Sequence, residues 1–482
     1  MRKEVLILLA KQVLNNAVRN KAVLALCGII LLLMAYAAFS GYSAYKKQTE
    51  SRKKNEAEIR HNWEHMPDKH PHRMAHYGYI AFRPKAALSF FDFGIESYTG
   101  NAVFLEAHRQ NTVNFSEAGF STGLLRFGEI SIALVLQLLV PLLLFFLGFN
   151  TIAAERENNT LKVLLSQGAN WKEIIAGKSL GLLTMALLLL LPAVIMTVGI
   201  WALQNNSSST GDEVMRLLWL LVSYTVFFAI VSVIAVTVSA ISKTAKMALI
   251  SLIGIWLLFG IVLPRATQAL GNWLHPSPSK IEFETAVEKD LIQKGDSHNP
   301  DDAYYKALKD SMLKAYKASS VEQLPFNYGG FQMKEGEKIS AQIYTKHLDS
   351  LLDTYESQNG VARATSFVNP FMAIKNVSMA FSGTDFGAYT RFQKEAEAYR
   401  YRLAQHMNDL QMKLISNKKL ADTAKPYSIS KAYWAAFPDF SYKPLSQKEV
   451  MKNEIISIIA LVFWIAVLLI IINRLSKKLK AI

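Results

Sequence analysis

Residues 179–203 read SLGLLTMALLLLLPAVIMTVGIWAL, a run of twenty-five residues that contains no Asp, Glu, Lys or Arg. A helix needs about 20 consecutive apolar residues to cross the hydrocarbon core of a bilayer. This run is therefore predicted to be a membrane-spanning helix. It places the chain among integral membrane proteins before any other feature is considered.

Five further runs have the same apolar character, and none has a charged residue near its middle. The chain is therefore predicted to be an all-α polytopic membrane protein with six transmembrane helices, at 22–40, 128–149, 179–203, 217–241, 247–264 and 453–473. We expect Pro264-Arg265 to stop the fifth helix, and Pro141 and Pro192 to kink the second and third.

Polar side chains inside the six spans are few and uncharged, so the sequence predicts neither a proton relay nor an ion pathway. They are Gln137, Ser223, Ser232, Thr237 and Ser239. This composition favours a process driven by ATP over one driven by an ion gradient, and it is compatible with an amphiphilic substrate.

Lys and Arg in short connections orient a membrane protein, because such connections stay on the cytoplasmic side. Lys243 and Lys246 lie in the connection 242–246, whereas QNNSSSTG at 204–211 has no basic residue. The loop 204–216 is therefore expected outside, with both termini in the cytoplasm. The segments expected on the cytoplasmic side are 1–21, 150–178, 242–246 and 474–482.

The first cytoplasmic segment, 1–21, has apolar residues at helical spacing between Lys3, Lys11 and Arg19. The apolar residues are Val5, Leu6, Leu9, Val13, Leu14 and Ala17. This pattern predicts an amphipathic helix that lies on the cytoplasmic leaflet. The alternative is that the segment begins a longer membrane helix.

Two long polar segments are expected outside, because long segments translocate largely regardless of their charge. Segment 41–127 is predicted to be a small mixed domain, and segment 265–452 a large, mainly helical domain. Within the large domain, apolar residues at helical spacing predict helices at 280–293, 301–317, 337–356 and 386–415. We interpret their apolar faces as core.

The chain has 53 Lys and Arg against 38 Asp and Glu, a formal net charge of +15. In a membrane protein, such an excess is explained by basic cytoplasmic segments and by attraction to anionic lipids. No basic motif with interleaved aromatic residues suggests a nucleic-acid surface. Membrane lipids are therefore the predicted partner, and nucleic acid is not.

The most informative stretch is FNTIAAERENNTLKVLLSQG at 149–168, which begins at the last residue of the second predicted span and continues into the connection 150–178. A charged corner at 155–157 is followed by a short helix whose apolar ridge is Leu161, Leu164 and Leu165. Gly168 is suited to end that helix in a left-handed turn. Asn170 followed by Glu173 then predicts a capping box at the start of the next helix. The pattern predicts a rigid elbow with an apolar ridge for a partner's groove and charges to orient it.

Here the chain resembles the permeases of ABC-2 type transporters. In that family, a segment of the form ERE-x-x-T-L-x-x-LLS, followed by a helix ending in GK at the next span, forms the coupling helix seated on the ATPase. Asn159 stands where relatives commonly have Gly. By this resemblance, the residues assigned to ATPase coupling are Glu155, Arg156, Glu157, Thr160, Leu161, Leu164, Leu165, Ser166, Gly177 and Lys178.

The outer segments resemble a bacterial subgroup of these permeases that has a large extracytoplasmic insertion. The matching residues are Ala75-His76-Tyr77-Gly78-Tyr79, Pro264-Arg265, Phe392 and Glu397-x-x-Arg400. The resemblance implies a bacterial inner-membrane transport subunit, with its large domains in the periplasm, that exports or moves an envelope substrate. It also implies a separate ABC ATPase, a second permease subunit, identical or related, and an envelope protein as a candidate partner.

Gly177-Lys178-Ser179 looks like the end of a phosphate-binding loop, but that motif requires Gly where this chain has Lys172. No other segment could cradle nucleotide phosphates. We therefore expect no ATP hydrolysis and no cofactor in this chain, with ATP and Mg²⁺ bound by the partner ATPase. No catalytic Ser/His/Asp or Cys/His set is identifiable, and no catalytic residue is predicted.

Five of the ten histidines lie within one outer stretch. They are His61, His65, His70, His72 and His76. Two pairs have i,i+4 spacing, which places two imidazoles on one helix face, and imidazole suits zinc or copper. Pro67 and Pro71 interrupt any continuous helix, however, and Lys69 and Arg73 oppose a cation. The prediction is a solvated or hydrogen-bonded surface, with a metal site as the alternative.

Two other functions remain open at this point. The chain could be an ATPase-coupled transmitter of force or signal across the membrane. It could also be a membrane-anchored extracytoplasmic metal-binding module, which would not need the elbow at 150–178. The substrate, the direction of transport and the choice between homodimer and heterodimer do not follow from the sequence.

Overall fold

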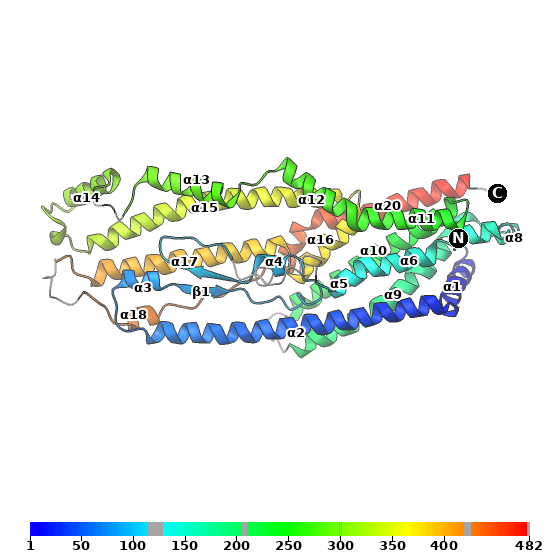
Figure 1. Cartoon of the computed structure of the whole chain (residues 1–482), viewed down its shortest axis with the longest axis horizontal. Coiled ribbons are helices and arrows are strands. Elements are labelled where there is room, and N and C mark those ends of the chain that lie inside the picture. Colours follow the sequence, from blue (N-terminus) through cyan, green and yellow to red (C-terminus); the bar gives the residue numbers. More distant parts are fainter. Residues whose placement is uncertain (114–128, 205–209, 298, 300, 419–425, 480–482) are drawn as a thin grey trace.

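The computed structural model describes residues 1–113, 129–204, 210–297, 299, 301–418 and 426–479. The protein is mostly helical and elongated, with both termini at one end (Figure 1). In the described ranges, six helices are long and apolar enough to cross a membrane: Lys21–His65, Ile132–Glu157, Trp171–Leu203, Gly211–Ile241, Ala245–Leu274 and Ile455–Lys478. The prediction of six such helices is therefore confirmed.

We call the end with both termini the apolar bundle, and the opposite end the distal region. The bundle contains the first half of α2 (Lys21–His65) and α1 (Lys3–Arg19), α5 (Ile132–Leu134), the π-helical turn η3 (Val135–Leu139), α6 (Val140–Gly148), α7 (Ala153–Glu157), α8 (Thr160–Ser166), α9 (Trp171–Leu203), α10 (Thr210–Ile241), α11 (Ala245–Leu257), the π-helical turn η4 (Leu258–Val262), α12 (Leu263–Leu274), α16 (Pro370–Ser382), α19 (Gln447–Asn453) and α20 (Ile455–Lys478).

The distal region contains the second half of α2 and the remaining elements. These are α3 (Pro71–Tyr77), β1 (Tyr79–Phe82), α4 (Glu96–Thr99), β2 (Ala102–Leu105), α13 (Lys280–Lys294), α14 (Ala303–Ala315), the 3-10 turn η5 (Val321–Gln323), α15 (Tyr328–Thr365), α17 (Phe386–Leu414) and α18 (Ala432–Ala435). Parts of the predicted segments 41–127, 128–149, 204–216, 265–452 and 474–482 lie outside the described residues.

Helix α1 forms where the amphipathic helix was predicted, within segment 1–21. It ends at Arg19, and the extended backbone of Asn20 separates it from α2, so it is not the start of the first span. Its buried residues Leu9, Val13 and Ala17 belong to the core that also includes α9. The apolar face of α1 therefore packs on the protein's own membrane helix.

Helix α2 does not end near residue 40, where the first span was predicted to end, but continues to His65 as one helix of 45 residues. The second half is polar and is supported by ion pairs one turn apart, Arg52 with Glu56 at 2.7 Å and Arg60 with Glu64 at 2.6 Å. Trp63 is buried and anchors the far end, because its indole N–H donates to the Trp434 carbonyl.

The predicted stop of the fifth span at Pro264-Arg265 is wrong, because the helix continues through Pro264 to Leu274. Proline removes a backbone N–H and crowds the preceding turn. In this span the π-helical turn η4 ends two residues before the proline and widens the helix there. The same arrangement occurs in the second span, where η3 precedes Pro141.

A π-helical turn leaves backbone carbonyls without their usual partners in the helix, and side chains can satisfy them. The Asn369 amide donates to the Phe259 carbonyl of η4 at 2.8 Å. The Trp256 indole donates to the Leu138 carbonyl of η3 at 2.9 Å. The two widened turns are thus stabilised by residues from neighbouring elements.

Helix α16 lies within the segment 265–452 that was expected to be entirely outside the spans. Its residues Phe371, Ile374, Val377 and Phe381 are buried in the same apolar core as the membrane helices. With 13 residues it is too short to span a bilayer, so hydropathy alone did not distinguish it from a soluble helix. The structure therefore assigns α16 to the apolar bundle.

The two predicted outer domains share one core in the distal region. Strands β1 and β2 pair antiparallel, with Tyr79 opposite Leu105. Trp63, Met74 and Val103 from the first segment pack with α17 and α18 from the second, through Phe392, Tyr399, Leu403, Met407 and Trp434. The segments 41–127 and 265–452 are therefore not separate folding units where they are described.

Candidate functional site

The elbow, residues 150–178, projects from the end of the bundle where the N-terminus lies, with α8 outermost (Figure 1). Two residues with a left-handed backbone conformation determine its turns. Asn159, at φ 61°, turns the chain between α7 and α8, and Gly168, at φ 84°, follows the end of α8. Asn tolerates this conformation better than most residues, and Gly adopts it without cost. The predicted turn at Gly168 is confirmed.

The predicted capping box at the start of α9 is also confirmed. The Asn170 side chain accepts from the Glu173 N–H at 2.8 Å, and the Glu173 carboxylate accepts from the Asn170 N–H at 3.2 Å. Glu173 has a second role that the sequence did not show, because it pairs with the Arg2 guanidinium at 2.7 Å. The N-terminal residues are thereby held against the elbow.

In the charged corner at 155–157, Glu155 and Arg156 are half-buried and Glu157 is exposed. Glu155 forms an ion pair of 2.7 Å with Lys178, whose side chain is only 2% exposed. Lys178 also donates to the Thr151 carbonyl, and Gln12 of α1 donates to the Glu155 carboxylate at 3.2 Å. Glu155 and Lys178 therefore join the two ends of the elbow to each other.

Arg156 and Glu157 contact the ends of two other membrane helices. Arg156 donates to the carbonyls of Ala240 and Ser242, at the C-terminal end of α10. Glu157 accepts from the Ala245 N–H at 3.3 Å, at the N-terminal end of α11. A cation at a helix C-terminus and an anion at a helix N-terminus both complement the helix dipole.

Ser239 of α10 makes a further connection to the start of the elbow. Its hydroxyl accepts from the N–H groups of Ile152 and Ala153, both at 3.0 Å, and donates to the Phe149 carbonyl at 2.8 Å. A single hydroxyl thus satisfies the backbone where the second span ends. The sequence indicated Ser239 only as a polar residue within a span.

The expected apolar ridge is not free for a partner. Leu161 is completely buried, and Leu164 and Leu165 are half-buried, so that prediction is wrong for Leu161. Val163, which was not predicted as a contact residue, is 52% exposed. The other exposed residues of the corner and of α8 are polar: Glu157, Asn158, Asn159, Thr160, Lys162 and Ser166.

The two remaining hydroxyls and the glycine predicted in the elbow have local roles. The Thr160 hydroxyl donates to the Glu155 carbonyl at 3.2 Å, and the Ser166 hydroxyl donates to the Val163 carbonyl at 2.9 Å. Gly177 faces α1, where a Cβ would lie 2.8 Å from that of Leu9. All ten predicted coupling residues are therefore grouped in one elbow, but only part of that group is accessible.

Close contact between α1 and α9 depends on Gly181 as well. A Cβ at Gly181 would lie 2.8 Å from both the Ala10 carbonyl oxygen and the Val13 Cβ. We expect Gly181→Leu to displace α1 and to lower the stability of the protein by about 1–3 kcal/mol. Limited proteolysis at the α1 lysines and thermal unfolding in detergent would measure this. Gly199→Leu on the same helix is the control, because a Cβ there meets open space, and equal effects would contradict the prediction.

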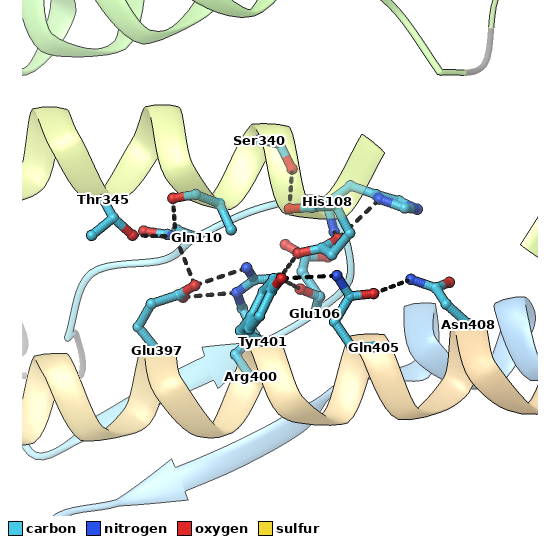
Figure 2. Close-up of polar contacts among 12 residues, drawn as sticks. Glu106, His108, Gln110, Ser340, Thr345, Glu397, Arg400, Tyr401, Gln405 and Asn408 are labelled. Atoms are coloured by element: carbon cyan, nitrogen blue, oxygen red, sulfur yellow. Dashed lines mark hydrogen bonds and ion pairs between the residues drawn. The ribbon is translucent and has the colours of Figure 1, made fainter. Parts of the chain in front are cut away.

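A second polar cluster lies in the distal region, between α15 and α17 (Figure 2). Arg400 is 2% exposed and pairs with Glu337 at 2.6 Å and with Glu397 at 2.7 Å. Gln110 donates to Glu397 at 2.6 Å, and Arg400 donates to the Glu106 carbonyl at 3.2 Å. The cluster thus connects both helices to the chain that follows β2.

The charged groups of this cluster shift one another's pKa values. Burial acts to raise the pKa of Glu337, but His108 and Arg400 outweigh it and lower that pKa to about 2. Burial raises the pKa of Glu397, and this effect is larger than the lowering caused by Arg400. Arg400 is therefore the cation that keeps the buried Glu337 ionised.

The five histidines of the predicted cluster do not come together. His61 and His65 stack near the end of α2, with ring centroids 4.0 Å apart. His70 caps α3, accepting from the His72 N–H at 3.3 Å, and burial lowers its pKa. His72 and His76 face each other on α3, and both lie near His108, which is distant from the five histidines in the sequence.

A family described as a domain of unknown function (DUF3526) matches residues 280–443. This match covers roughly a third of the chain and includes α13 to α18, with Glu337, Glu397 and Arg400. The elbow lies outside it. No curated protein matches the chain.

Proposed function

We propose that this chain is the permease subunit of an ABC-2 type transporter, energised by a separate ATPase that binds ATP and Mg²⁺. The observation that supports this most is the elbow. It exposes a polar tip, and its inner residues bond directly to α1, α9, α10 and α11. A partner bound at the tip could therefore act on several membrane helices at once.

The bonds of the elbow explain how such an action would spread. Arg156 holds the end of α10, Glu157 holds the start of α11, and the Glu155–Lys178 pair holds α9. Because these contacts join the elbow to several helix ends, we propose that the elbow and the helix ends move together. ATP binding that closes the ATPases would then reorient the spans together.

A second permease subunit, identical or related, completes this proposal, since six helices are too few to enclose a path for a substrate. The fifth span supports such pairing, because its apolar side chains are largely unpartnered in the single chain. Exposed fractions reach 71% at Ile250 and 52% at Val262. We place this face at the subunit interface or against lipid.

In this proposal the elbow and both termini are cytoplasmic, and the membrane is the bacterial inner membrane. The distal region then lies in the periplasm, where it receives or passes on an envelope substrate or engages an envelope protein. Export is the proposed direction. The chain itself does not hydrolyse ATP.

The exposed tip gives a direct test of the ATPase contact. We expect Val163→Asp to reduce ATPase binding by about tenfold or more, because a charge would replace the one large exposed apolar side chain described on α8. The tagged chain would be purified in mild detergent from its native host, and its partners quantified by mass spectrometry. A stoichiometric ATPase is expected with the wild type.

Ile281→Asp is the matched control for this test. Ile281 is 76% exposed on α13 in the distal region, so the same charge is introduced far from the elbow. The control should retain the ATPase. The proposal would be contradicted if the wild type never recovers an ATPase while other membrane complexes survive, or if Val163→Asp retains it fully.

A second candidate is a complex that transmits force or a signal without transporting a solute. The continuity of α2 from the bundle to the distal region favours this function. Spin labels at Lys54 of α2 and Ile281 of α13 would distinguish the two. A distance change that follows ATP binding without movement of any solute would favour the transmitter.

A further inference from the structure

Helix α3 presents two imidazoles on one face. His72 and His76 are one turn apart, and their Nε2 atoms are 3.2 Å from each other. The interruption expected from the prolines does not affect this pair, because Pro71 occupies the first position of α3 and the helix is intact to Tyr77. The two side chains therefore converge as the i,i+4 spacing requires.

A third imidazole comes from the chain that follows β2. His108 has a left-handed backbone, at φ 63°, which is uncommon for a residue other than Gly. Its ring centroid is 5.3 Å from that of His72 and 5.1 Å from that of His76. In all three histidines, one ligand atom lies within 4.8 Å of the corresponding atoms of the other two.

A carboxylate orients the third imidazole. The His108 Nδ1 atom lies 3.1 Å from Glu337, a residue of α15 that is completely buried and ion-paired with Arg400. Histidines that bind metals commonly donate their second ring N–H to a carboxylate, which fixes the tautomer and makes the ligating nitrogen more basic. With Nδ1–H directed to Glu337, Nε2 is the nitrogen with which His108 would coordinate a metal ion.

We propose that His72, His76 and His108 bind one divalent transition-metal ion of the zinc–copper class, with Glu337 as the supporting carboxylate. Bonds of about 2.0–2.1 Å to a tetrahedral ion place ligand nitrogens about 3.4 Å apart. The separation of the His72 and His76 Nε2 atoms, 3.2 Å, is close to this value. The three ligand atoms lie within 4.8 Å of one another, so the rings would have to move closer together to bind one ion. Three imidazoles suit zinc and copper, and leave a fourth position open.

The surroundings of the site allow an ion to enter. His76 is exposed, and His72 and His108 are half-buried, so solvent reaches the cluster. Lys69, which the sequence suggested would oppose a cation, lies over the ring of Tyr77 at 5.6 Å and contacts Met66. A bound ion would connect α3 to the chain after β2, and through Glu337 to α15.

The test uses the full chain purified in detergent and stripped with a chelator. After incubation with Zn²⁺ or Cu²⁺ and desalting, the wild type is expected to retain one equivalent of metal by elemental analysis. The Cu²⁺ form should show nitrogen hyperfine structure in its paramagnetic resonance spectrum. His76→Ala and His108→Asn are expected to lose the metal, and asparagine is chosen because it tolerates the left-handed backbone.

His61→Ala with His65→Ala is the matched control, since that pair has the same i,i+4 spacing and lies outside the proposed site. This variant should retain the full equivalent. Glu337→Gln should weaken binding by about 10- to 100-fold. His76 is exposed, so His76→Ala is expected to perturb the fold least, and size exclusion checks the folding of every variant.

Three results would overturn the proposal. The wild type could retain no metal, which would mean that the three imidazoles only hydrogen-bond with one another. The His61 and His65 variant could lose the metal, which would locate the site on α2. His76→Ala and His108→Asn could both bind as the wild type does. None of these depends on whether an ATPase binds the elbow.

Discussion

Arg400→Ala is expected to destabilise the distal region by about 3–5 kcal/mol, because it leaves buried carboxylates without their cation. Glu337 is completely buried, and Glu397 is only 13% exposed at its side chain. Arg400 also donates to the Glu106 carbonyl, which then loses that partner. The remaining groups would have to bind protons or draw water into the core between α15 and α17.

Thermal unfolding in detergent and hydrogen exchange of α15 and α17 would measure this effect. Arg402→Ala is the control, since Arg402 lies two residues after Arg400 on the same helix and is exposed. It should change stability by less than about 0.5 kcal/mol, as surface substitutions usually do. Similar losses in both variants would mean that the buried cluster does not stabilise the distal region.

Lys178→Met is expected to have the largest effect in the elbow. It removes the cation paired with Glu155 and the donor to the Thr151 carbonyl, at a side chain only 2% exposed. Breaking such a buried pair typically costs about 3–5 kcal/mol. If the elbow couples an ATPase to the spans, ATP hydrolysis should also become independent of the state of the membrane helices.

A double-mutant cycle separates the pair from its surroundings. Lys178→Met with Glu155→Gln should be more stable than Lys178→Met alone, because the uncompensated carboxylate is gone. Lys162→Met is the control for a lysine that is exposed on α8. Additive effects of the two substitutions, measured by thermal unfolding in detergent, would contradict a stabilising ion pair.

The sequence predicted the six long helices, and the capping box and Gly168 turn of the elbow, since each depends on residues close together in the chain. For the same reason, the helix predicted at 280–293 corresponds to α13, and the helix predicted at 386–415 corresponds to α17. Span ends were less predictable. The charged half of α2 has no apolar stripe of its own, although its i,i+4 ion pairs were a usable signal.

The interior of the elbow could not be predicted from the sequence. Leu161 has the spacing of an exposed ridge, and only the tertiary packing shows that it is buried. Arg2 lies 171 residues before Glu173, and no local pattern connects them. A motif identified the right segment, but which side chains face a partner depends on contacts that are distant in the chain.

The histidine cluster illustrates the same limit. His72 and His76 were identified by their spacing, whereas His108 follows a strand that pairs with β1 and reaches the cluster only through that pairing. The five histidines were grouped by density in the sequence. Their positions in space separate His61 and His65 from the pair on α3.

The two π-helical turns make the second and fifth spans sensitive to length. Each turn accommodates one residue more than an α-helical turn, so deleting a residue from Leu258–Val262 would restore a regular helix. Everything beyond the deletion would then rotate by about 100°. Gly271, which packs closely on the Gln358 backbone of α15, would face elsewhere. In these two spans, the number of residues is therefore as constrained as their identity.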